Sequence, residues 1–363
     1  MTSPPDYSRL FDSQIEAFFR DTVKTCLKRP ALAGFFIRTV AHQQAAARRR
    51  SEWAARGLHV PPLLIASITD QCNLRCRNCY AQAHCRPGRT EMPVARWAEV
   101  FAEARDLGIS IIMVAGGEPL TRPEMLNVTA NLPGVIFPLF TNGLLLDDAI
   151  IGRLTEQRDV IPVLSIEGFE AATDSRRGAG VYDAVQGAVD RLERAGVFFG
   201  VSLTMTRHNF ATVTGDEFIA GLVKSGCRLV FLVEYTPVTP ESESLVLEPA
   251  QKAAVEPTRA SLAARYPLVC AAFPGDEEQY GGCLAAGRGF VHVGPDGSLE
   301  PCPFAPFSDT SVRDRPLKEA LASEFLARVR EGHDKLSESE GGCALWRNRD
   351  WVTGLLDASK GRT

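Results

Sequence analysis

The sequence lacks three features that would direct it to a membrane, to export or to nucleic acid. No apolar run among its 363 residues approaches the length needed to span a bilayer, and we expect no membrane contact. The first residues, MTSPPDYSRLFDSQ, have neither a basic start nor an apolar core, so we expect no signal peptide and a cytoplasmic location. The net charge of −4 argues against a general nucleic-acid binder, and we expect no nucleic-acid partner.

Cysteine is present in a number and a pattern that suggest metal ligation. A cytoplasmic protein keeps its thiols reduced, so its ten cysteines favour metal binding over disulfides. Cys72, Cys76 and Cys79 have C-x₃-C-x₂-C spacing and follow an apolar run at 62–68. Three thiolates on one short loop suit a soft metal centre. Structural zinc is the alternative, but it usually takes four ligands, whereas three cysteines leave one iron of a four-iron cube open to a small molecule.

Short apolar, β-branched runs alternate with amphipathic segments from residue 61 onward. This alternation predicts an α/β fold with right-handed crossovers and a parallel sheet. Six strands are too few for a full eight-stranded barrel, and functional groups are expected at the carboxyl ends of the strands. The predicted strands are 62–68, 109–115, 135–140, 160–166, 197–205 and 228–235, with helices near 93–107, 121–132, 146–156, 181–195 and 211–225.

The pattern divides the chain into three predicted parts. Residues 1–60 form an N-terminal helical segment, interrupted by Pro30, that is expected to cap the bottom of a barrel. Residues 61–236 form the partial barrel. Residues 237–363 form a linker and a small extension with helices ending near 265 and spanning about 316–331. In the extension, Pro-Asp-Gly at 295–297 predicts a β-hairpin.

The cysteine loop resembles that of a known family. Cys72-Asn73-Leu74-x-Cys76-x-x-Cys79 after a first barrel strand is similar to the hallmark of radical S-adenosylmethionine (radical SAM) enzymes. The resemblance implies a partial (β/α)₆ barrel and a [4Fe–4S] cluster whose fourth iron binds S-adenosylmethionine (AdoMet). It also implies an external one-electron donor such as flavodoxin or ferredoxin. Reductive cleavage of AdoMet would give a 5′-deoxyadenosyl radical that takes a hydrogen atom from a substrate.

The same resemblance suggests residues that contact AdoMet. Gly-Gly-Glu at 116–118 resembles the family's motif for the methionine amino group, and adjacent glycines let a ligand approach the backbone. Thr-Asn-Gly at 141–143 is similar to segments beside AdoMet. A Ser-x-Glu sequence at 165–167 suits the ribose hydroxyls, and a guanidinium before Gly178 suits the AdoMet carboxylate. The candidate contacts are Tyr80, Gly116, Gly117, Glu118, Asn142, Ser165, Glu167 and Arg177, the last chosen over Arg176.

A second group of cysteines resembles part of the SPASM and Twitch extensions of radical SAM enzymes. Cys283, Gly297 and Cys302 match the start of that pattern, and the predicted hairpin would bring Cys283 and Cys302 together. Cys343 is the third candidate ligand. A full SPASM domain has seven cysteines, so the resemblance implies one auxiliary [4Fe–4S] cluster, with Cys270 as a possible fourth ligand. A small zinc site or unpaired thiols are the alternatives.

The resemblance leaves the substrate open. A second cluster would accept an electron from the substrate radical or anchor the substrate, which favours an oxidative outcome such as a dehydrogenation, cross-link or rearrangement. The first 60 residues do not resemble a winged-helix peptide-recognition module, which tilts the prediction toward a small or lipid-like substrate. A maturase of ribosomal peptides is the alternative enzyme, and a non-catalytic iron–sulfur electron carrier is the alternative of another class. Glu234, which ends the sixth predicted strand, is the candidate substrate contact.

Overall fold

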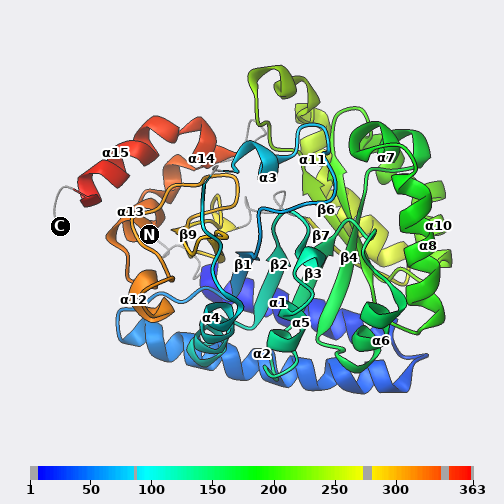
Figure 1. The fold of residues 1–363 in the computed structure, drawn as a ribbon, viewed down its shortest axis with the longest axis horizontal. Helices are drawn as coiled ribbons and strands as arrows, with labels where there is room; N and C mark the ends of the chain where they lie inside the picture. The colour runs from blue at the N-terminus through cyan, green and yellow to red at the C-terminus, as the bar shows by residue number, and fades with distance from the viewer. Residues whose placement is uncertain (1–6, 86–87, 273–279, 337–342, 361–363) are drawn as a thin grey trace.

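One twisted sheet organises the protein. The computed structural model describes residues 7–85, 88–272, 280–336 and 343–360. Nine strands lie in the order β7-β6-β5-β4-β3-β2-β1-β8-β9 (Figure 1). The first six pair in parallel and in chain order, as βαβ crossovers require. They are β1 (Leu63–Ser67), β2 (Ile111–Ala115), β3 (Phe137–Thr141), β4 (Val160–Ile166), β5 (Gly200–Met205) and β6 (Leu229–Glu234).

All six predicted barrel strands are present, so the predicted partial barrel is confirmed. Their residues are almost all buried, because a parallel sheet is covered on both faces and its strands are apolar throughout. Helix α7 was not predicted, and the single helix predicted near 211–225 is divided into α9 and α10. The connecting helices are α3 (Tyr80–Ala83), α4 (Val94–Leu107), α5 (Met125–Thr129), α6 (Asp148–Glu156), α7 (Glu170–Arg177), α8 (Val181–Arg194), α9 (Phe210–Val213) and α10 (Asp216–Lys224).

An N-terminal helical hairpin closes the end of the barrel where the strands begin. It consists of α1 (Tyr7–Thr25) and α2 (Pro30–Ala55), which lie across the molecule from α3 and α7 (Figure 1). Pro30 starts α2, where its missing N–H is not needed. The α2 side chain Arg50 donates a hydrogen bond to the carbonyl of Gly108, which ends α4. The predicted helical cap is therefore present.

A pair of substitutions on α2 tests this packing. Phe36 is 1% exposed and its ring lies 4.9 Å from that of Phe198, two residues before β5, whereas the adjacent Ile37 is 58% exposed. Phe36→Ala is expected to lower the free energy of unfolding by about 3–5 kcal/mol because it leaves a cavity. Ile37→Ala should change it by less than about 0.5 kcal/mol. Denaturant melts of both variants would measure the difference, and equal losses would contradict this packing.

The C-terminal third of the chain extends both edges of the barrel sheet. After α11 (Pro249–Arg265), β7 (Val269–Ala272) pairs in parallel with β6. At the other edge, β8 (Phe290–Val293) pairs in parallel with β1 and forms the predicted hairpin with β9 (Leu299–Glu300). The strand β7 was not predicted. The remaining helices are α12 (Leu317–Leu321), α13 (Glu324–Glu331), α14 (Ala344–Arg347) and α15 (Arg349–Lys360).

A buried polar chain fixes this hairpin to the barrel. Nε2 of His292, on β8, lies 2.8 Å from Oγ of Ser67, on β1. Nδ1 of the same ring lies 2.8 Å from Oε2 of Glu300, on β9. All three side chains are buried, so their mutual hydrogen bonds replace those lost to water. These hydrogen bonds therefore hold β8 and β9 in register beside β1, the strand that leads into the cysteine loop.

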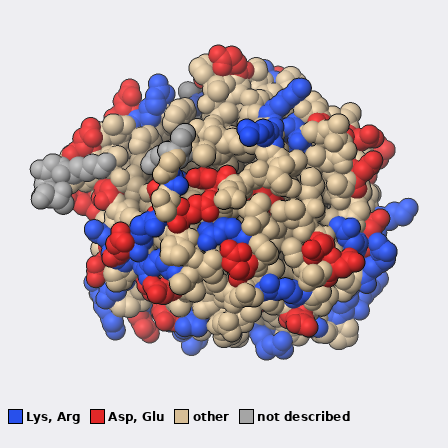
Figure 2. Space-filling view, viewed as in Figure 1, with Lys and Arg blue, Asp and Glu red and all other residues tan. Residues whose placement is uncertain are grey.

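The surface shows no concentration of one charge on the face in view. Basic and acidic side chains are interspersed there (Figure 2). No helix in the described ranges is long and apolar enough to cross a bilayer.

Candidate active site

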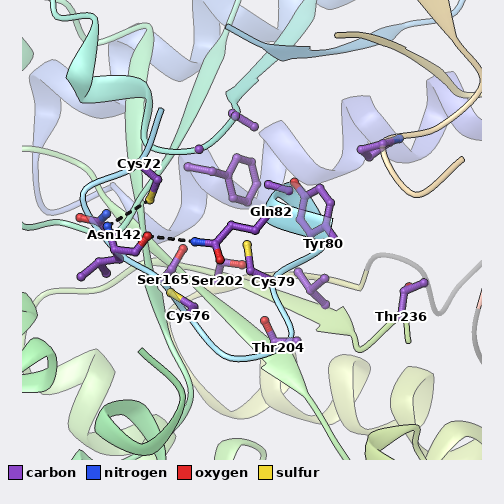
Figure 3. Close-up of a pocket in the computed structure, with 18 of the residues that line it drawn as sticks. Cys72, Cys76, Cys79, Tyr80, Gln82, Asn142, Ser165, Ser202, Thr204 and Thr236 are labelled. Carbon is purple, nitrogen blue, oxygen red and sulfur yellow. Dashed lines mark hydrogen bonds between the residues drawn. The ribbon is translucent and has the colours of Figure 1, made fainter. Parts of the chain in front are cut away.

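A cavity of about 210 Å³ lies where the barrel strands end. Its wall combines the cysteine loop, the carboxyl ends of β2 to β6, helix α7 and the segment after Cys302 (Figure 3). Parallel strands bring their carboxyl ends to one side, which is why residues far apart in sequence meet here. The predicted residues on this wall are Cys72, Cys76, Cys79, Tyr80, Gly116, Gly117, Asn142, Ser165, Arg177 and Glu234.

Two hydrogen bonds that involve Leu74 hold the cysteine loop in shape. Cys72 Sγ accepts a hydrogen bond from the N–H of Leu74 at 3.4 Å, and Gln82 Nε2 donates to the carbonyl of Leu74 at 3.0 Å (Figure 3). Asn78 has a φ of 54°, a left-handed conformation that asparagine tolerates better than most residues. The three thiols are free and half-buried, and they face the cavity.

The two glycines after β2 fit against the cysteine loop. A Cβ on Gly117 would lie 2.2 Å from the carbonyl oxygen of Gln71, and one on Gly116 would lie 2.4 Å from that of Thr69. The N–H of Gly117 donates to the Thr69 carbonyl at 2.8 Å. We interpreted these glycines as room for a ligand, but in the structure the cysteine loop itself uses that room.

A substitution at Gly117 tests this close approach. Gly117→Ala should displace the cysteine loop, because backbone atoms rather than a flexible side chain stand in the way. We expect iron incorporation to fall by at least about tenfold, as when supporting contacts of a metal site are lost. Gly152→Ala, on α6 with nothing within 4 Å of the added carbon, is the control and should load normally. Iron analysis after reconstitution measures both, and normal loading of Gly117→Ala would contradict the steric account.

The carboxylate of Glu118 lies behind the cavity wall. It accepts hydrogen bonds from Thr141 Oγ1 at 2.8 Å, from the N–H of Asn142 at 2.7 Å and from the N–H of Leu120 at 3.0 Å. Burial raises the pKa of Glu118, and these three hydrogen bonds oppose the shift. Glu118 thus joins the ends of β2 and β3, and its predicted direct contact with an AdoMet amino group has no support in this geometry.

Asn142 is tied to the cysteine loop. Its Nδ2 donates to Oδ1 of Asn73 at 2.7 Å, and its Oδ1 accepts from the N–H of Leu144 at 3.0 Å. It also lines the cavity, so the structure places it where the sequence prediction requires.

Two arginines of α7 share one buried carboxylate. Glu167 Oε1 accepts from Arg177 Nε at 2.9 Å and Nη2 at 2.6 Å, while its Oε2 lies 2.8 Å from Arg176 Nη1. Both arginines line the cavity and Glu167 does not. The predicted pairing of Ser165 with Glu167 at a ribose is therefore unsupported for Glu167. Both guanidinium groups are therefore oriented by one carboxylate.

An aromatic pair joins the cysteine loop to the C-terminal extension. The rings of Tyr80 and Phe304 lie 4.8 Å apart at an interplanar angle of 65°. Burial raises the pKa of Tyr80. Phe304 follows Cys302 by two residues, so the loops that carry the two cysteine groups meet at this pair.

Residues 66–215 match the family model described as the radical SAM superfamily. The chain contains a radical SAM domain. It is 25% identical over 311 residues to an AdoMet-dependent heme synthase of Methanosarcina barkeri (strain Fusaro / DSM 804), over 78% of this chain and 89% of that protein. It is 32% identical over 189 residues to mycofactocin maturase MftC of Mycobacterium tuberculosis (strain CDC 1551 / Oshkosh), which covers 50% of this chain but only 46% of MftC.

A solved structure of similar fold extends beyond the radical SAM domain. Streptococcus suis SuiB bound to precursor peptide SuiA superposes with a TM-score of 0.61 over 80% of this chain and 71% of that one, at 15% identity. At this identity the likeness concerns the fold alone. Together with the curated relatives, it supports a radical SAM domain followed by a C-terminal extension.

The cysteine loop fits the cofactors that radical SAM domains use, a [4Fe–4S] cluster and AdoMet. Cys72, Cys76 and Cys79 supply three thiol groups on one loop, all facing one cavity. Thiolates are the ligands that iron–sulfur clusters require. The neighbouring cavity leaves room for a small molecule on the same side. The donor set and its placement therefore agree with this cofactor pair.

The second cysteine group of the radical SAM protein lies in the extension. Cys283, Cys302 and Cys343 are all more than nine-tenths buried, and none forms a disulfide. The thiols of Cys302 and Cys343 share a hydrogen bond, and Cys283 is near enough to act on Cys302 electrostatically. The pKa of Cys302 is raised, mainly by burial of the thiol and next by its hydrogen bond with Cys343. The structure thus brings together the three predicted cysteines, while residues 341–342 before Cys343 lie outside the described residues.

Cys270 does not belong to that group, which corrects one suggestion from the sequence. It lies on β7, at the sheet edge opposite β8 and β9, and burial raises its pKa to about 12. Within the ranges that the structure describes, no three His, Cys, Asp or Glu side chains are placed to hold a single metal ion.

Glu234 borders the cavity, but its carboxylate is engaged elsewhere. Oε2 lies 3.7 Å from Nζ of Lys252, on α11. Side chains alternate along a strand, so Phe231, Val233 and Tyr235 share the face that lines the cavity. The sequence places Glu234 and Tyr235 together at the end of the sixth strand, and sequence reasoning chose Glu234 as the contact and missed Thr236 as a wall residue.

Proposed function

We propose that the protein is a radical SAM enzyme that cleaves AdoMet and abstracts a hydrogen atom from a substrate in the barrel cavity. A second [4Fe–4S] cluster, held by Cys283, Cys302 and Cys343, would support an oxidative outcome. One observation carries the proposal: the AdoMet-site cysteine loop and the segment after Cys302 line the same cavity. A substrate bound there would lie between the two cysteine groups.

Different residues of the chain would then bind the first cluster and AdoMet. Cys72, Cys76 and Cys79 would hold the first cluster, which when bound supplies the electron that cleaves AdoMet to methionine and a 5′-deoxyadenosyl radical. Asn142 and Ser165 would hydrogen-bond AdoMet from the strand ends, and the backbone of Gly116 and Gly117 would border it. The apolar side chains of the lining, such as Met113, Phe140 and Phe231, would help to keep water from a reactive radical.

The arginine pair of α7 suits the AdoMet carboxylate. Glu167 is one carboxylate shared by Arg176 and Arg177, and both guanidinium groups border the cavity. A carboxylate at that place would form charge-assisted hydrogen bonds with a guanidinium that is already oriented. Glu167 would act as a positioning residue for Arg177 rather than as a ribose ligand.

A small or lipid-like substrate is the first choice. One relative aligned over most of both chains is an AdoMet-dependent heme synthase, whose name indicates a small-molecule product, and another is a PqqA peptide cyclase, whose name indicates a peptide. A ribosomal-peptide maturase is the second candidate, favoured by the resemblance to MftC and by the SuiB–SuiA peptide complex. In either case a flavodoxin or ferredoxin would deliver the electron.

AdoMet binding separates the enzyme from a plain electron carrier. The anaerobically reconstituted protein should bind AdoMet in a calorimetric titration with one site per chain. An electron carrier needs no AdoMet site at the strand ends, so it should show no heat of binding when AdoMet is added. The apo protein is the control, because three cysteines without iron offer AdoMet no open metal position. Saturable binding to the loaded protein alone supports the enzyme, and its absence contradicts the proposed function.

A further inference from the structure

A buried arginine lies beside the second cysteine group. Arg288 is only 3% exposed, although arginine is rarely buried to this degree. Its Nη1 atom donates to the carbonyl of Gly282 at 2.9 Å and to that of Cys283 at 2.7 Å, and its Nη2 atom donates to the carbonyl of Tyr280 at 2.6 Å. The guanidinium group therefore holds the segment that leads into Cys283, the first of the three candidate ligands of the extension.

This segment, residues 280–283, has little rigidity of its own. Gly281 has a φ of 73° and Gly282 a φ of 106°, so two successive residues adopt backbone conformations that are accessible mainly to glycine. The N–H of Cys283 donates to the carbonyl of Leu336 at 3.1 Å, and a Cβ on Gly282 would lie 3.1 Å from that same oxygen. The backbone around Cys283 therefore depends on its contacts with Leu336 and Arg288.

The turn that carries Arg288 is also bonded to the loop of Cys302. The N–H of Ala286 donates to the carbonyl of Pro301 at 3.0 Å, and Pro301 directly precedes Cys302. Ala286 has a φ of 56°, which is uncommon for a residue other than glycine. Such a conformation costs free energy and persists where the surrounding contacts enforce it. Arg288 thus belongs to a turn that is connected to both Cys283 and Cys302.

Two further arginines lie near the second cysteine group. Arg330 Nη1 donates to the carbonyl of Ala286 at 2.8 Å. Arg347 is near enough to Cys343 to act on its thiol electrostatically. Carbonyl oxygens orient the guanidinium groups of Arg288 and Arg330 without neutralising their charge. Three guanidinium groups thus lie close to the place where the cysteines meet.

A cluster held by these cysteines would be an anion that a buried cation stabilises. Thiolate ligands give a [4Fe–4S] centre a net negative charge, and reduction adds one more electron. Net charge and hydrogen bonding near such a centre set its reduction potential. A guanidinium bonded to the carbonyl of a ligand residue interacts strongly with the centre, because the protein interior screens charge less than water does. It would stabilise the reduced form more than the oxidised form.

We propose that Arg288 is a positioning residue that holds Cys283 for the second [4Fe–4S] cluster, and that its charge raises the reduction potential of this cluster. The proposal rests on the proposed function, because it assumes that Cys283, Cys302 and Cys343 bind the cluster. A raised potential suits a centre that accepts an electron, rather than one that only anchors the substrate.

Arg288→Gln and Arg288→Lys test the role of the charge. Glutamine is neutral, whereas lysine keeps the positive charge and has three hydrogen-bond donors. Each protein is reconstituted anaerobically, analysed for iron and titrated redox-potentiometrically, with electron paramagnetic resonance reporting both clusters. In Arg288→Gln, the one-electron reduction constant of the second cluster should fall at least about tenfold, which is about 59 mV. Alternatively, the second cluster is lost and the iron content falls from about eight to about four. Arg288→Lys should recover most of either loss, and the first cluster should be unchanged in both variants.

Arg50→Gln is the matched control. Arg50 is 7% exposed and also donates to a backbone carbonyl, that of Gly108, but it lies on α2 at the end of the barrel where the strands begin. Its substitution should leave the second cluster unchanged. Wild-type loading and potential in Arg288→Gln, equal losses in Arg288→Gln and Arg288→Lys, or the same loss in Arg50→Gln would each overturn the proposal.

The wild-type protein and Cys302→Ala separate this proposal from the proposed function. If wild type holds about eight irons and Arg288→Gln behaves like wild type, only the role of Arg288 fails. If wild type holds about four irons and Cys302→Ala holds the same number, the second cluster does not exist and both proposals fail.

Discussion

Cys76→Ala is expected to abolish AdoMet cleavage. Among the residues that the structure describes, the thiols that line the cavity are those of Cys72, Cys76 and Cys79, so the loss of one would leave a cluster with two protein ligands. Substitution of a residue that merely hydrogen-bonds to a metal ligand already lowers metal affinity or activity by about 10–100-fold. Loss of a direct ligand should therefore lower 5′-deoxyadenosine formation by more than about 100-fold. Cys72→Ala and Cys79→Ala should behave alike. The measurement is chromatographic assay of 5′-deoxyadenosine after anaerobic reconstitution and reduction.

A nearby cysteine provides the control for this series. Cys85 is exposed, lies six residues beyond Cys79 in the sequence and does not line the cavity. Cys85→Ala should retain wild-type cleavage and iron content. Deoxyadenosine formed by Cys76→Ala at the wild-type rate would contradict the assignment of the cysteine loop.

Cys302→Ala is expected to remove one whole cluster while leaving AdoMet cleavage in place. Two four-iron clusters give about eight irons per chain, and one gives about four. The variant should therefore fall from about eight to about four irons, yet still form deoxyadenosine, because Cys72, Cys76 and Cys79 are unchanged. Hydrogen abstraction would no longer lead to the oxidised product. Iron and sulfide analysis, with electron paramagnetic resonance of the reduced protein, would measure the loss.

Cys270→Ala is the control for the auxiliary site. It removes a thiol that is buried to a similar degree, but on β7 at the other edge of the sheet. It should keep about eight irons. If Cys302→Ala keeps the same iron content as this control, the cysteines of the extension do not hold a cluster.

The barrel could be predicted because its pattern is repeated and local. Each of the six strands is an apolar run bounded by an amphipathic helix, and the parallel order follows from the crossovers. The two edge strands, β7 and β9, are harder to predict from the sequence. Val269–Ala272 contains only four residues, and β9 only two, so neither shows a period. Only the Pro-Asp-Gly turn revealed β9.

The sequence predicted which loops and strand ends form the site, but it did not predict the contacts of every side chain. Most of the residues chosen from the cysteine spacing and the strand ends line one cavity, and Glu118 and Glu167 do not. The bonding of Glu118 and Glu167 could not be predicted, because their partners come from β3 and from α7, and nothing local reveals such contacts. The role of Gly116 and Gly117 was obscured for a similar reason. The atoms that require glycine belong to the loop at 69–71, about 45 residues earlier.

The central claim is that two cysteine groups hold two clusters and that one of them, with AdoMet, generates a radical. Its most direct test is one anaerobic experiment in which reconstituted protein is analysed for iron, reduced with dithionite and assayed with AdoMet for 5′-deoxyadenosine. The account predicts about eight irons per chain and deoxyadenosine formation. Fully loaded protein that neither binds AdoMet nor forms deoxyadenosine would contradict it.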